Sequence, residues 1–117
     1  MPEQQFVRFA FYKVDPSYRA LSTREKYDLR GELADTVQSF GDRMILRSYS
    51  TVGTRGDCDL LLWQVSYDMD DIHHLAGAVN STCLGRYLTL PYSYLAMTKR
   101  SVYVDKHVHE GQEGRIR

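Results

Sequence analysis

The chain has 117 residues, the size of a single domain, and 43% of them are hydrophobic, which is enough for a substantial core. Lysine plus arginine and aspartate plus glutamate number 15 each, so the net charge is zero. This balance disfavours binding to nucleic acid or to an anionic membrane through bulk charge. No apolar run approaches the roughly 18 residues of a membrane span, and no apolar leader precedes the first predicted strand. We therefore expect a cytoplasmic protein.

The first third of the chain predicts a strand followed by a helix. Phe6–Lys13 alternates, with Val7, Phe9 and Phe11 on one face. Asp15-Pro16 opens a helical segment, because proline is tolerated in a first turn. Ser22 and Glu25 have the spacing of a capping box, which restarts the helix. The apolar residues at helical spacing, which mark the buried side of this helix, are Leu29, Leu33, Val37 and Phe40. The helix is predicted to end at Gly41-Asp42.

The middle of the chain predicts a hairpin, with strands over Met44–Val52 and Asp57–Tyr67. The turn between them runs from Gly53 to Gly56, because glycine tolerates the positive φ of tight turns. The second strand is apolar on both faces: Leu60 and Leu62 point one way, and Leu61, Trp63 and Val65 point the other. A strand of this kind must be covered on both sides.

The last third predicts a second helix and a fourth strand. Asp70 is the expected cap of the helix, and Pro91 is expected to follow the helix exit. The fourth strand covers Tyr92–Thr98, with an extension through Val104 left open. The apolar positions of the helix are Ile72, Leu75, Ala76, Val79 and Cys83.

Two cysteines, Cys58 and Cys83, are expected in a strand and in a helix. A disulfide is disfavoured in a protein that is not secreted. We expect two buried, reduced thiols.

The order of elements is βαββαβ, which predicts an α+β, ferredoxin-like fold. Two helices cover one face of a four-stranded antiparallel sheet, and the topology leaves the other face open. Because the strands are apolar on both sides, the open face is predicted to be an interaction surface.

Three segments resemble one family. YSTVGTRGDCDLLLW (49–63) resembles the central hairpin of the chlorite dismutase family, whose commonest members are the coproheme decarboxylases of haem biosynthesis. STCLGRYLTLPYSYLAMTKRSVYV (81–104) is similar to the second helix, last strand and exit of that family's first domain. FVRFAFYKVDPSYRALS (6–22) fits the first strand and helix entry. The resemblance covers residues 6 to 110.

The resemblance implies one half of a dimeric α+β barrel, in which two similar domains press their sheet faces together. It implies that residues 1–104 form the N-terminal domain and that residues 105–117 form an inter-domain linker or flexible tail. In the family, haem or coprohaem, its axial histidine and the working tyrosine or arginine belong to the second domain. This chain alone is expected to bind no cofactor and to be no enzyme.

The implied function is that of a structural, oligomerising domain of a haem-dependent oxidoreductase. The chemistry of the family is peroxide-driven decarboxylation of coprohaem propionates or, less often, decomposition of chlorite to chloride and dioxygen. The implied partner is a second ferredoxin-like domain or a second copy of the chain, bound through the sheet face. The alternative is a stand-alone short protein whose two copies form a dimeric α+β barrel, either cofactor-free or with haem between the subunits, acting as a small oxidoreductase or a ligand-binding module. A third hypothesis is an interaction module that binds no ligand.

The histidines are weak candidates for ligands. His107 and His109 would share one face of a strand, with Glu110 or Glu113 as a further ligand, but a solvated linker explains them more simply. His73 and His74 are adjacent on a helix, so their rings diverge by about 100° and a surface position is expected.

Three arginines and three aromatic residues complete the candidates. Arg55, between two glycines, is expected at an exposed turn tip, with a phosphate or propionate as the alternative contact, and Arg115 and Arg117 lie at the domain exit. Tyr92 and Tyr94 are expected on a sheet face with their hydroxyls paired, and Trp63 is expected as a core or interface anchor. We assign no catalytic, cofactor-binding or metal-ligating residue.

Overall fold

The computed structural model describes residues 4–98. The predicted tail 105–117 and the extension of the last strand through Val104 lie outside the described residues. The elements, in chain order, are β1 (Phe6–Val14), the 3₁₀ helix η1 (Pro16–Ala20), α1 (Thr23–Gln38), β2 (Ile45–Ser50), β3 (Leu60–Ser66), α2 (Met69–Ser81), the 3₁₀ helix η2 (Leu84–Tyr87) and β4 (Leu88–Met97). The predicted order is confirmed, and each predicted strand lies within a few residues of the observed one.

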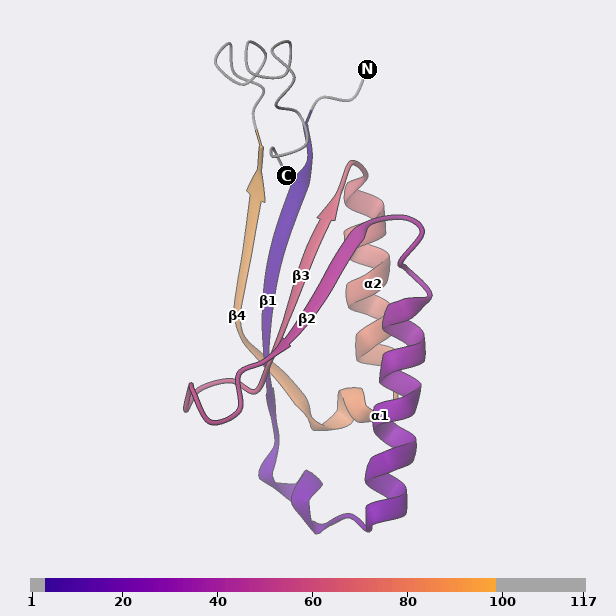
Figure 1. Ribbon diagram of the computed structural model, residues 1–117, viewed down its shortest axis with the longest axis vertical. Helices are drawn as coiled ribbons and strands as arrows, with labels where there is room; N and C mark the ends of the chain where they lie inside the picture. Colours follow the sequence, from indigo (N-terminus) through magenta and orange to yellow (C-terminus); the bar gives the residue numbers. More distant parts are fainter. Residues whose placement is uncertain (1–3, 99–117) are drawn as a thin grey trace.

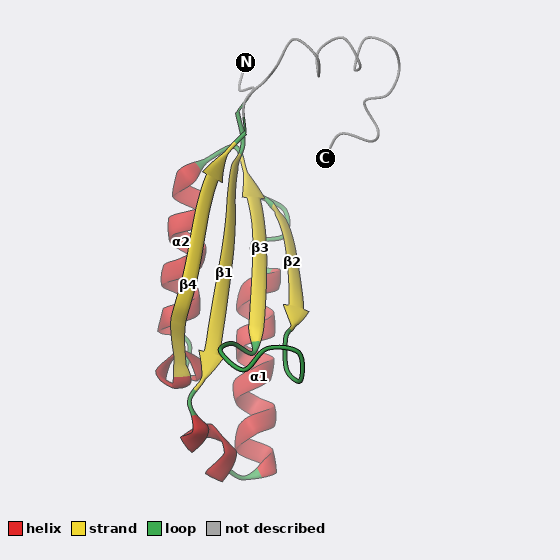
Figure 2. Ribbon diagram, turned by 90° about the vertical axis from the view of Figure 1, so that its left-hand side faces the viewer, coloured by secondary structure: helices red, strands yellow, loops and turns green. Residues whose placement is uncertain are grey.

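The four strands form one sheet in the order β2-β3-β1-β4, and each neighbouring pair is antiparallel. Both long helices lie on the same side of this sheet, as Figures 1 and 2 show. This arrangement confirms the ferredoxin-like α+β fold. Within the described residues, no helix is long and apolar enough to cross a membrane.

The core lies between the sheet and the helices. Ala10 and Tyr12 of β1 and Leu62 of β3 pack there against Leu75 and Val79 of α2. Phe40 and Met44, which follow α1, complete this cluster. The alternation predicted for β3 is therefore confirmed, because Leu60 and Leu62 face the helices.

Helix α1 begins as predicted but packs differently. The hydroxyl of Ser22 accepts the backbone N–H of Glu25, and the Glu25 carboxylate accepts the N–H of Ser22, which completes the capping box. The bond from the Ser22 N–H, followed by the contact with the Ser22 side chain, lowers the pKa of the Glu25 carboxyl group. The predicted buried stripe is wrong for the helix itself, because α1 has no buried residue and Leu29, Leu33 and Val37 are only half-buried.

The cause lies in the strand beneath α1. On its helix-facing side, β2 offers Ser48 and Ser50 beyond Leu46, and both serines are exposed. Short polar side chains cannot fill the space below a helix, so the apolar stripe of α1 lacks a partner of matching size.

The surroundings of α2 correct two predictions. The cap is Asp68 rather than Asp70: the Asp68 carboxylate accepts the N–H of Asp70 at 2.9 Å. The helix ends at Ser81, so Cys83 lies beyond it and is exposed. Its N–H donates to the Glu32 carboxylate at 2.9 Å.

Cys58 is buried but precedes β3 in the connecting loop, so only one of the two thiols is buried as predicted.

Pro91 lies inside β4 rather than before it. β4 is an edge strand, and its register against β1 shifts between Phe11↔Tyr92 and Lys13↔Thr89. The shift adds one residue to β4 in the region of Pro91. An edge strand with a bulge tolerates a residue that has no N–H to donate, which explains why the strand continues through the proline.

Candidate functional site

The helix-free face of the sheet gathers most of the aromatic residues that the sequence singled out. Directly paired residues of neighbouring strands point to the same side, so the register defines this face. We call it the aromatic face; its residues are Val7, Phe9, Phe11, Ile45, Arg47, Tyr49, Leu61, Trp63, Val65, Tyr92, Tyr94 and Ala96. Tyr92 and Tyr94 lie on a sheet face as predicted, and Trp63 lies on the same face; its role as an interface anchor stays a prediction.

Three rings of the aromatic face form a cluster across β1 and β4. Phe11 meets Tyr92 edge-on with ring centres 6.2 Å apart, and it meets Tyr94 edge-on at the same distance. Tyr92 and Tyr94 are stacked, with centres 6.3 Å apart. Such contacts stabilise by about 0.5–1.5 kcal/mol each beyond the burial of area.

The loop between β2 and β3 folds back across the lower end of this face, in front of the sheet in Figure 2. Gly53 permits the turn, because its φ is +86°. Arg55 donates two hydrogen bonds of 2.8 Å to the Asp57 carboxylate. Its guanidinium carbon lies 5.5 Å from the ring centres of both Phe11 and Tyr92. Arg55 is exposed in the turn region, as predicted, and its side chain also belongs to an ordered cluster with Asp57, Phe11 and Tyr92.

Three groups of this cluster, Arg55, Asp57 and Tyr92, shift one another's pKa values. Hydrogen bonds from Arg55 and then from Tyr92 lower the pKa of Asp57, and the bond to Asp57 raises the pKa of Arg55. The same carboxylate raises the pKa of Tyr92, because the neutral phenol donates to it. The carboxylate therefore stays ionised and Tyr92 stays neutral around pH 7. The Arg55 charge is already paired, which disfavours the alternative of a phosphate or propionate contact.

The upper and outer parts of the aromatic face stay open in the described chain. Tyr94 is 56% exposed and Tyr49 is 51% exposed. Ile45 adds a further exposed aliphatic side chain. A contiguous apolar surface of this kind is typical of a protein–protein or domain–domain interface.

The histidines do not form a site in the described part of the chain. His73 and His74 are both exposed on α2, as predicted. Residues 4–98 contain no group of three or more potential metal ligands. An axial haem ligand needs a fixed imidazole in an apolar pocket, and neither described histidine provides one. The remaining candidates lie outside the described residues: His107, His109, Glu110, Glu113, Arg115 and Arg117.

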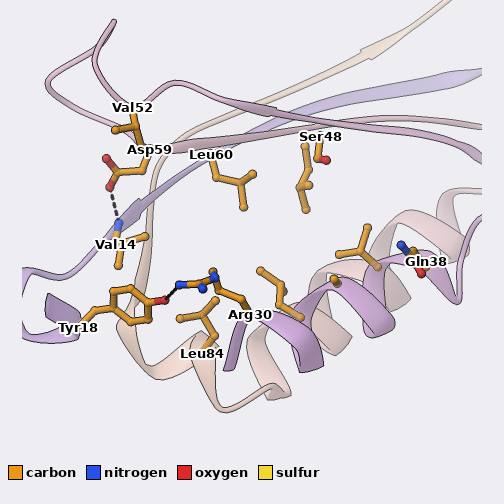
Figure 3. Close-up of a pocket in the computed structure, with 13 residues that line it drawn as sticks. Val14, Tyr18, Arg30, Gln38, Ser48, Val52, Asp59, Leu60 and Leu84 are labelled. Atoms are coloured by element: carbon orange, nitrogen blue, oxygen red, sulfur yellow. Dashed lines mark hydrogen bonds between the residues drawn. The ribbon is translucent and has the colours of Figure 1, made fainter. Parts of the chain in front are cut away.

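A cavity of about 440 Å³ lies on the opposite side of the sheet, beneath α1 (Figure 3). Its walls are mainly apolar, and Arg30, Tyr18 and Asp59 lie together at one end. No sequence pattern predicted this cavity, because its lining residues, Ala34 and Ser48 among them, come from separate elements that only the fold brings together.

A buried polar pair was also missed. Arg8 and Gln64 are register partners on β1 and β3, and both are buried. Arg8 Nε donates to Ser93 Oγ at 3.1 Å, while both polar atoms of the Gln64 amide have no partner in the described chain. The signal was present in the alternation of β3, which places Gln64 on the same side as Leu62.

The sequence of the chain is similar to that of known chlorite dismutases. Residues 26–116 match the sequence profile of the family described as Chlorite dismutase. A curated chlorite dismutase from Ideonella dechloratans is 25% identical over 101 residues, which cover 86% of this chain and 35% of that protein.

Solved structures show the same fold. The chlorite dismutase of Candidatus Nitrospira defluvii in complex with imidazole superposes with a TM-score of 0.79 at 22% identity, over 87% of this chain and 43% of that one. A haem-binding protein from Thermus thermophilus superposes with a TM-score of 0.68 at 20% identity, over 86% of this chain and 47% of that one. The chain thus spans less than half the length of these relatives. Because the profile matches most of its residues, the chain belongs to the chlorite dismutase family.

Proposed function

We propose that this domain is the structural half of a haem-dependent oxidoreductase, and that its aromatic face packs against the sheet of a second ferredoxin-like unit. The observation that carries the proposal is the aromatic face itself, which combines an ordered aromatic cluster with exposed Tyr49 and Tyr94. Leaving such side chains in water forgoes roughly 1.5–3 kcal/mol for each large apolar group. A matching sheet face would recover this free energy.

Family membership supports the haem-related role, and the short span relative to the longer relatives supports a second unit. That unit is a second domain or a second copy of this chain. The cofactor would be haem or coprohaem held by groups outside residues 4–98, because the described residues offer no buried imidazole. Within the family, decarboxylation of coprohaem propionates is our first candidate reaction, and chlorite decomposition is the second.

The experiment is an association assay with matched variants. Sedimentation velocity of the 117-residue chain over a concentration series, alone and with a separately expressed second half, measures complex formation. Tyr94→Arg places a charge on the aromatic face and should abolish association. Tyr27→Arg is the control, because Tyr27 is 67% exposed on α1, on the other side of the sheet.

Two outcomes of these measurements would count against the proposal. A chain that stays monomeric at every concentration, and that also fails to bind the second half, would contradict the proposal. Tight, stoichiometric binding of haem to the chain alone, followed in the Soret band and lost on His107→Ala or His109→Ala, would move the cofactor site into this chain.

A further inference from the structure

The cavity beneath α1 has the size and the lining of a ligand site. Its volume of about 440 Å³ falls within the roughly 300–1,000 Å³ of small-molecule pockets. Leucine and valine side chains from four elements of the fold and one loop form the walls. They are Val14 of β1, Leu33 and Val37 of α1, Val52 of the loop after β2, Leu60 and Leu62 of β3, and Leu84 of η2. The cavity lies on the opposite side of the sheet from the aromatic face, so it is independent of the proposed domain contact.

Two short side chains are among those that line the space. They are Ala34 of α1 and Ser48 of β2. The buried Phe40 after its last turn anchors the C-terminal end of α1 in the core. Two short side chains cannot fill the volume between the helix and the sheet.

One end of the cavity carries donors and positive charge. The Arg30 guanidinium donates to the Tyr18 hydroxyl oxygen at 3.2 Å, which leaves the Tyr18 O–H free to donate further (Figure 3). Within residues 4–98, Arg30 forms no ion pair. The Lys26 ammonium lies 5.9 Å from the centre of the Tyr18 ring and adds a second cation.

The carboxylate at this end is already engaged. Asp59 Oδ2 accepts the backbone N–H of Val14 at 2.8 Å and thereby ties the start of β3 to the end of β1. The Arg30 guanidinium has no ion-pair partner within residues 4–98, and the carboxylate that lines the same apolar cavity is already hydrogen-bonded. An anionic head group on an apolar body complements this combination.

We propose that this cavity binds a small monocarboxylate with an aliphatic body, such as a medium-chain fatty acid. The aliphatic chain lies between α1 and β3, against Leu33, Leu60 and Leu62. The carboxylate accepts hydrogen bonds from Arg30 and from the Tyr18 hydroxyl. No covalent step is involved.

Decanoate and its neutral counterpart 1-decanol are suitable probes for the 117-residue chain. Titrations followed by the methyl NMR signals of leucine and valine report both affinity and position. We expect decanoate to shift the signals of Leu33, Val37, Leu60 and Leu62. Arg30→Gln should weaken decanoate roughly 10-fold or more and leave 1-decanol unchanged, since a bond to a charged group is lost. Arg24→Gln is the matched control, because Arg24 lies on the same helix and pairs with Asp28.

Two further variants sharpen the test. Asp59→Asn removes a negative charge but retains an acceptor for the Val14 N–H, so decanoate should bind more tightly. Ala34→Leu fills the cavity and should abolish the binding of both probes, with folding checked by circular dichroism. Equal affinity for the two probes, or an Arg30→Gln variant with unchanged affinity for decanoate, would overturn the proposal. So would shifts confined to the aromatic face, or the absence of binding.

Discussion

The two long helices cover the same sheet, yet they pack in different ways. α2 buries Ile72, Leu75 and Val79, whereas α1 is longer and buries none of its residues. Both carry apolar residues at helical spacing. The difference lies beneath them: α2 packs on large core side chains such as Leu62, whereas α1 lies over Ser48 and a cavity. Periodicity identifies the inner side of a helix but does not reveal what fills the space below.

The largest expected effect is the loss of a side chain beneath α2. Leu75 is fully buried in the core cluster, so Leu75→Ala should lower the free energy of unfolding by about 2–5 kcal/mol. Leu33→Ala, the corresponding change in α1, should cost only about 1 kcal/mol because Leu33 is half-buried beside a cavity. Urea unfolding followed by circular dichroism measures both. Equal losses would show that α1 packs as tightly as α2.

The next effect concerns the start of α1. Ser22→Ala removes the acceptor for the Glu25 N–H and should lower the free energy of unfolding by about 1 kcal/mol. Ser22→Asp keeps a capping oxygen and should restore most of the stability. The same denaturation experiment distinguishes them. If the two variants lost equal stability, the capping box would not be the feature that holds this end of the helix.

Some of these structural features could be predicted from the sequence, and others could not. Ser22 and Glu25 are three residues apart, and so the capping box could be predicted from local spacing. The strands followed from alternation, and the four-stranded sheet followed from the element order. The approach of Arg55 to Phe11 and Tyr92 could not be predicted, because it depends on a loop that folds across two strands distant in the chain. The cavity that Ala34 and Ser48 both line is equally non-local.

A smaller effect is expected from filling the cavity. Ser48→Val should raise the free energy of unfolding by about 0.5–1 kcal/mol, because it adds apolar volume below α1 and favours the strand conformation. Ser50→Val is the control, since Ser50 also faces the helix side of β2 but does not line the cavity. Thermal unfolding measures the difference. A Ser48→Val variant less stable than the wild type would show that the space is not available to a methyl group.

The smallest effect is a change in titration on the aromatic face. The hydrogen bond to Asp57 raises the pKa of Tyr92. The stabilisation that this bond gives the folded protein is therefore complete below the ordinary phenol pKa near 10, and it is lost as the pH rises through the raised pKa. Asp57→Asn should lower the pKa of Tyr92 toward its ordinary value. The pH dependence of tyrosine absorbance in the ultraviolet measures this change. The pKa of Asp57 is lowered in the folded protein. The stabilisation from its ionised carboxylate is therefore present above the ordinary carboxyl pKa, and it is lost as the pH falls through the lowered pKa. A titration of Tyr92 that Asp57→Asn leaves unchanged would contradict the hydrogen bond between them.

The proline in β4 limits how this protein aggregates. An exposed sheet edge is a template on which another chain can add a strand and begin a fibril. In β4 the missing N–H of Pro91 and the neighbouring register shift interrupt that template between Thr89 and Tyr92. A foreign strand therefore finds a regular ladder only over the second half of β4, after Pro91. A single replacement, Pro91→Val, would restore a donor there and make the edge more prone to self-assembly.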